Sequence, residues 1–112
     1  MTPLLRQLVW VLPMLVIAAL LEAGGDAGMR AGIRGKPQGF LFGALALVAY
    51  GIAVNVPKWD FGRLLGVYIA VFFVVSQLIA VLAFKEKIGA PTLVGGALIV
   101  AGGAVLTFWQ AR

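Results

Sequence analysis

Residues 8 to 30 of the 112-residue chain read LVWVLPMLVIAALLEAGGDAGMR. An almost unbroken apolar run is followed by two carboxylates, Glu22 and Asp26, four residues apart, and then by the basic residue Arg30. The stretch has roughly the 20 residues that a helix needs to span a membrane. It therefore predicts a transmembrane helix that carries two acidic groups.

Three further apolar runs follow, over residues 39–56, 64–84 and 90–109. With a first helix over about residues 4–30, they predict four spanning α-helices. None of the runs alternates apolar and polar residues, so spanning β-strands are not indicated. The segments between the runs carry charges together with glycine or proline, which is typical of loops. We expect an all-α integral membrane protein with one four-helix domain over residues 1–112; a cleaved signal peptide over residues 1–23 is the less favoured alternative.

The composition agrees with a membrane location and argues against several other classes. Charged residues make up 12% of the chain, whereas a soluble domain has about 25%. Because the chain lacks cysteine and histidine, we expect no disulfide, no metal centre and no cofactor. The net charge is +5, but the basic residues form no continuous run in the sequence. The charge therefore favours contact with anionic headgroups over nucleic-acid binding. An enzyme is not expected either, because no nucleophile–base pair or phosphate-binding loop is recognisable.

The basic residues are nearly balanced between the two sides of a four-helix arrangement. With both termini on one side, Arg6, Lys58, Arg63 and Arg112 lie on that side, and Arg30, Arg34, Lys36, Lys85 and Lys87 lie on the other. An excess of Lys and Arg normally sets the orientation of a membrane protein. The balance therefore predicts insertion in both orientations and an antiparallel homodimer. The alternative is one orientation set by other means, such as the folding speed of a loop.

The fourth apolar run carries two pairs of glycines at a spacing of seven residues, Gly95 with Gly102 and Gly96 with Gly103. Seven residues are close to two helical turns, so each pair shares a face of the helix. Small residues let helices approach closely in lipid. We interpret these glycines as a dimer interface, with packing inside one chain as the alternative.

Glu22 and Asp26 share one face of the predicted first helix. Counted back from Arg30 at about 1.5 Å per residue, Glu22 lies roughly 12 Å and Asp26 roughly 6 Å inside the membrane edge. Burial favours a neutral acid, whereas a nearby cation favours the carboxylate. Protons and a cationic substrate would therefore compete for the same oxygens, which predicts proton-coupled export of small or lipophilic cations. The alternative is pairing with Arg30 or exposure at a solvated helix end.

Other residues of the spans could take part in such a site. Tyr50 and Tyr68 offer ring faces that attract cations and hydroxyls that can bond to Glu22; a packing or interfacial role is the alternative. Glycines 24, 25 and 28 leave bare faces beside the carboxylates, where a partner helix or a ligand could approach. We expect Ser76 and Gln77 to hydrogen-bond between helices.

Three stretches, in their order and spacing, resemble the small multidrug resistance superfamily of four-helix transporters. They are EAGGDAGMR at 22–30, FGRLLGVYIA at 61–70 and FKEKIGAPTLVGGALIVAGGAV at 84–105. EAGG and GRLLGVY are also similar to the YnfA-like branch of that superfamily. The resemblance implies a dual-topology antiparallel dimer in a bacterial-type inner membrane, with protons and a small cation as its ligands.

The resemblance also implies roles for single residues. Glu22 would be the shared proton and substrate site, Tyr68 would line the binding chamber, and Gly62 would lie in the turn before the third helix. Gly95 and Gly102 would be the dimer glycines of the fourth helix. The chain departs from the family pattern at residues 70–72, where Ala-Val-Phe replaces glycines that many members carry, and Asp26 is additional.

Two other functions stay open from the sequence. One is a non-transporting membrane subunit or one half of a heterodimer, in which Glu22 pairs with a base of the partner. The other is a component of a lipid-linked sugar flippase, in which Arg30, Arg34 and Lys36 hold phosphate.

Overall fold

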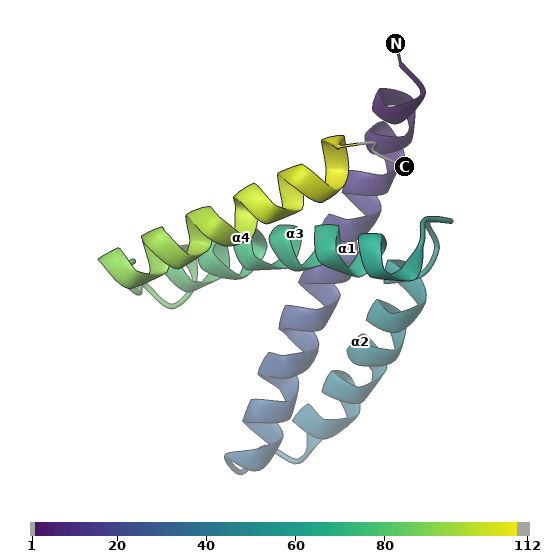
Figure 1. Ribbon diagram of the computed structural model, residues 1–112. Coiled ribbons are helices and arrows are strands. Elements are labelled where there is room, and N and C mark those ends of the chain that lie inside the picture. Colours follow the sequence, from purple (N-terminus) through teal and green to yellow (C-terminus); the bar gives the residue numbers. More distant parts are fainter. Residues whose placement is uncertain (1, 110–112) are drawn as a thin grey trace. The chain divides into compact units, whose positions relative to one another are not determined.

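The computed structural model describes residues 2–109, and this part of the chain folds into four α-helices joined by loops (Figure 1). They are α1 (Pro3–Ile33), α2 (Gln38–Val54), α3 (Phe61–Leu82) and α4 (Ala90–Phe108). The prediction of an all-α fold with four helices is confirmed. Arg112, which entered the charge balance, lies outside the described residues.

The ends of α1 follow from local sequence signals. The Thr2 hydroxyl accepts a hydrogen bond from the backbone N–H of Leu5, and Pro3 occupies the first turn, where a missing N–H costs nothing. The helix continues to Ile33, three residues past the predicted end, because no glycine with a left-handed backbone is reached before Gly35, whose φ is +102°.

The start of α3 differs from the prediction in a similar way. The helix begins at Phe61, directly after Asp60, which occupies the N-cap position. Aspartate is among the residues preferred there, but the Asp60 side chain makes no capping hydrogen bond; its backbone carbonyl oxygen accepts from the Leu64 N–H at 2.8 Å. Gly62, expected in the turn before the helix, is therefore the second residue of the helix itself.

Three of the four helices have the length and composition of membrane spans. These three, α1, α3 and α4, are long and apolar enough to cross a membrane, and α2 is a shorter apolar helix of 17 residues. At about 1.5 Å per residue, α2 is about 26 Å long, close to the roughly 30 Å thickness of the hydrocarbon core. Large apolar side chains are exposed along all four helices, which is the favourable placement in lipid and a costly one in water.

The chain divides into two compact units, Met1–Pro57 and Lys58–Arg112. In the first unit α1 packs against α2, and in the second α3 packs against α4 (Figure 1). Each pair is an antiparallel helical hairpin. That the two hairpins form one domain stays a prediction.

Glycines on both helices form the contact between α1 and α2. We call Gly25, Gly28, Gly32, Gly39 and Gly43 the glycine seam. A Cβ atom on Gly28 would lie 2.9 Å from the carbonyl oxygen of Gly39 and 2.9 Å from the Cα atom of Gly43. The two backbones are therefore in direct contact, an arrangement that lets membrane helices gain van der Waals packing without large side chains.

In the second hairpin, one arginine joins the start of α3 to the end of α4. The Nε and Nη2 atoms of Arg63, in the first turn of α3, donate to the carbonyl oxygens of Leu106 and Thr107 at 2.9 and 3.0 Å. These carbonyls lie in the last turn of α4 and have no partner within their own helix. The guanidinium carbon also lies 4.2 Å from the centroid of the Trp59 ring. Arg63 therefore caps α4 while its charge is stabilised by the indole face.

Candidate functional site

Glu22 lies on the packed face of α1. Ala18, Gly25 and Gly32 are buried on this face, and Glu22 follows Ala18 by four residues and precedes Gly25 by three. Spacings of three and four residues keep side chains on one stripe of a helix. The Glu22 side chain is accordingly half-buried, whereas Asp26, beside the stripe, is exposed.

The glycine seam determines which residue of α2 lies at the level of Glu22. Successive contacts along the antiparallel pair join Gly32 to Phe40, Gly28 to Gly43 and Gly25 to Leu47. Continuing this register by one turn brings Tyr50 to the level of Glu22. The electrostatics agree with the register, because the charges of both Glu22 and Asp26 act on the Tyr50 hydroxyl. The structure therefore brings these three side chains together in the first unit.

This group has the chemistry to hold either a proton or a cation. A carboxylate only accepts hydrogen bonds, whereas its protonated form also donates one, and a tyrosine hydroxyl can take either part. The Tyr50 ring adds a face that attracts positive charge. Asp26, one turn along the helix, adds a second acidic group to the same neighbourhood. No group of three or more His, Cys, Asp or Glu side chains that could hold a metal occurs among residues 2–109.

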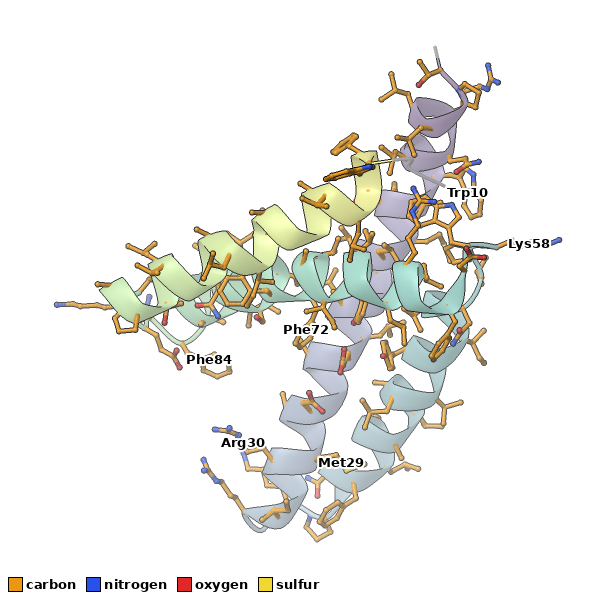
Figure 2. The ribbon with its side chains drawn as sticks, in the orientation of Figure 1. Trp10, Met29, Arg30, Lys58, Phe72 and Phe84 are labelled. Carbon is orange, nitrogen blue, oxygen red and sulfur yellow. The ribbon has the colours of Figure 1, made fainter. Side chains whose placement is uncertain are left out.

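The basic residue that follows the acidic pair extends outward. The Arg30 side chain is exposed and points away from α1 on the side opposite α2, whereas Met29 lies on the side of α2 (Figure 2). That Arg30 lies at the membrane edge, as the depth estimate for Glu22 assumes, stays a prediction.

Two other polar side chains predicted for the site lie in the second unit. Tyr68 is buried on α3, and its ring centroid lies 6.0 Å from that of Phe72. Its approach to Glu22 stays a prediction. Ser76 was expected to bond between helices, but its hydroxyl donates instead to the Phe73 carbonyl of its own helix at 2.8 Å, because a serine hydroxyl readily reaches the carbonyl one turn back.

The four glycines of α4 differ in their surroundings. Gly96 and Gly103 are buried, and an added Cβ would meet the Phe73 ring in one case and Ala70 in the other. Both therefore serve packing against α3 within the chain. Gly95 and Gly102 have no atom within 4 Å of an added Cβ, so their face has room for another helix. A dimer contact through any of the four stays a prediction.

The sequence interpretation missed that Gly32, Gly39 and Gly43 complete the glycine seam between α1 and α2. A helix does approach the bare faces at Gly25 and Gly28, as expected, and it is α2 of the same chain; Gly24 remains open. The signal was present, because glycines 28 and 32 and glycines 39 and 43 each have the GxxxG spacing that favours close helix contact.

Comparison with known proteins supports the membrane assignment. A UPF0060 membrane protein of Herpetosiphon aurantiacus is 34% identical over 71 residues, which cover 62% of this chain and 64% of the relative. The chain thus matches just under two thirds of that relative's length. No family model and no solved structure matches the chain. The relative and the three long apolar helices together identify the chain as a membrane protein.

Proposed function

We propose that the chain exports small or lipophilic cations in exchange for protons, as an antiparallel homodimer in a bacterial inner membrane. The observation that carries the proposal is the half-buried Glu22 on the packed face of a membrane helix, level with Tyr50. An acidic residue near the bilayer centre costs about 2.5–3.5 kcal/mol on insertion scales, and such residues generally mark ion or substrate pathways.

The proposed exchange depends on two exclusive states of Glu22. When the side chain is protonated, it has no charge to hold a cation, and the Tyr50 hydroxyl can accept its proton in a hydrogen bond. When a cation approaches, it favours the carboxylate and the proton leaves. Tyr50 then donates to the carboxylate, and its ring can face the cation. Asp26 adds negative charge on the path between the surface and Glu22.

Two observations support an antiparallel dimer. With four spans, the basic residues of the sequence would be almost equally divided between the two sides of the membrane, and the usual bias that fixes one orientation would be absent. In addition, Gly95 and Gly102 each leave open space at their Cβ positions on α4, and small residues of this kind allow membrane helices to approach closely. Two opposed copies would place two Glu22 side chains in one assembly.

A matched pair of glycine substitutions separates the dimer from the fold. Gly102→Leu is expected to weaken dimerisation, because overpacking a close contact costs about 1–3 kcal/mol, or about 5- to 150-fold in the association constant. The chain itself should remain folded, since Gly102 has open space around its Cβ position. Gly103→Leu should instead destabilise the α3–α4 hairpin, where Ala70 blocks the added side chain.

Cross-linking yield and thermal unfolding of both purified variants provide the measurement. A Gly102→Leu variant that forms as many dimers as the unsubstituted chain would contradict the proposed interface. A purified chain that never cross-links to itself would favour the heterodimer interpretation instead.

The function itself is tested with the purified chain in proteoliposomes. An imposed pH difference should drive movement of at least one member of a panel of cations, from guanidinium to tetraphenylphosphonium, and collapse of the pH difference should stop it. If no cation in the panel moves, or if movement is the same with and without the pH difference, the proposal fails.

A further inference from the structure

A groove of about 400 Å³ runs between α3 and α4 in the second unit. Six residues of α3 between Phe73 and Leu82 form one wall, Thr92, Leu93 and Gly96 of α4 form the other, and Ile88 contributes from the loop between the helices. Gln77 and Thr92 are the polar members of this lining. The groove is therefore an apolar slot parallel to the helices, and the proposed exchange at Glu22 does not use it.

The length of the groove matches one leaflet of a bilayer. Phe73 and Leu82 are nine residues apart, which corresponds to about 14 Å along a helix. Half of the hydrocarbon core is about 15 Å thick. The inner end of the groove lies at the Phe73 ring, which packs where Gly96 leaves no side chain. The other end lies at the loop that follows Leu82, at the membrane surface if α3 spans the bilayer.

The charges beside the outer end have the sign that attracts an anionic lipid. Lys85 and Lys87 are both exposed in this loop on either side of the exposed Glu86, so the three side chains are positive on balance, and Lys87 directly precedes Ile88 of the groove lining. Lys85 has a left-handed backbone, with φ of +56°, a conformation in which the Glu86 N–H bonds to the Ala80 carbonyl oxygen at 3.0 Å. Basic sites between transmembrane helices bind anionic headgroups, and lysines near the membrane surface strengthen that attraction.

We propose that the α3–α4 groove holds one acyl chain of an anionic phospholipid whose phosphate lies at Lys85 and Lys87. The apolar lining accepts the chain, the length of the groove limits it to one leaflet, and the two lysines select the headgroup. The occupant is therefore a lipid of the leaflet in which the 83–89 loop lies.

Native mass spectrometry of the purified full chain tests this site. Dioleoyl phosphatidylglycerol and dioleoyl phosphatidylcholine have the same acyl chains and differ in headgroup charge, so retention of the two lipids reports the charge selection. We expect the phosphatidylglycerol to be retained more strongly. In a variant with Lys85→Asn and Lys87→Gln, the preference should fall by roughly 30-fold, because each lysine near the surface contributes roughly fivefold. Asparagine suits position 85 because it tolerates the left-handed backbone.

A matched pair of substitutions tests the groove itself. Leu93 and Val94 are neighbours on α4 and are 62% and 65% exposed, but only Leu93 lines the groove. Leu93→Trp should fill the slot and reduce retention of both lipids, whereas Val94→Trp should leave retention unchanged.

Three results would overturn the proposal. These are equal retention of the two lipids by the unsubstituted chain, equal retention by the two tryptophan variants, and a dimer signal that Leu93→Trp removes while lipid binding stays the same. The last result would assign the groove to a second copy of the chain. None of these results depends on transport. The lipid site can therefore be disproved while the proposed export function stands, and the export function can be disproved while the lipid site stands.

Discussion

Replacing Glu22 with glutamine is expected to abolish proton-driven cation movement. Glutamine has nearly the same shape but carries neither an exchangeable acidic proton nor a negative charge, so both states of the exchange are lost. Removing one partner of a buried ion pair costs about 3–5 kcal/mol, which corresponds to roughly 150- to 5,000-fold in cation affinity. The initial rate of pH-driven uptake into proteoliposomes measures the effect.

Asp26→Asn is the matched control for this substitution. It removes the same charge one helical turn away, at an exposed position beside the packed face of α1, and a charge interaction at an exposed position contributes only about 0–1 kcal/mol. We therefore expect at most about a fivefold loss of rate. A Glu22→Gln chain that still accumulates cations against a proton gradient, or an Asp26→Asn chain with the larger defect, would contradict the assignment of Glu22.

The second large effect is expected in the glycine seam. Gly28→Ala would place a methyl group 2.9 Å from backbone atoms of Gly39 and Gly43, and backbone cannot move aside as a side chain can. Separating the helices should destabilise the first hairpin by about 1–3 kcal/mol. Because the seam sets the register that brings Tyr50 to Glu22, uptake should fall as well.

Gly24→Ala is the control for the seam. It makes the same change in the same helix, but nothing lies within 4 Å of the added atom, so the higher helix propensity of alanine should stabilise the chain by up to about 1 kcal/mol. Thermal unfolding followed by circular dichroism should thus show shifts of opposite sign for the two variants. Shifts of the same sign and size would mean that α1 and α2 do not meet at Gly28.

The helices could be predicted because their signals are local. An apolar run of about 20 residues predicts a membrane-spanning helix whichever helices it packs against. The observed helices start and end within three residues of the predicted ones. The differences arise at the ends, where single residues decide. α3 begins directly after Asp60, three residues before the apolar run, and the absence of a stop signal before Gly35 extends α1.

The candidate site could be predicted only in part, because it depends on which helices meet. The spacing of Glu22 and Asp26 placed both on one helix, but the partnership with Tyr50 requires the register of α2, which is set by backbone contacts through Gly28 and Gly43. Periodicity also could not tell Gly95 from Gly96. The two residues are adjacent in sequence, yet one faces α3 and the other faces open space.

The claim that a proton and a cation exclude each other at Glu22 is tested most directly by measuring how many protons are released when a cation binds. The purified chain, in a weakly buffered detergent solution, is mixed with a saturating amount of a cation that the uptake panel identifies as transported. Binding should release up to one proton per chain at pH values where Glu22 starts protonated, and the Glu22→Gln chain should release none. Saturable cation binding by the unsubstituted chain with no proton release at any pH would contradict the exchange.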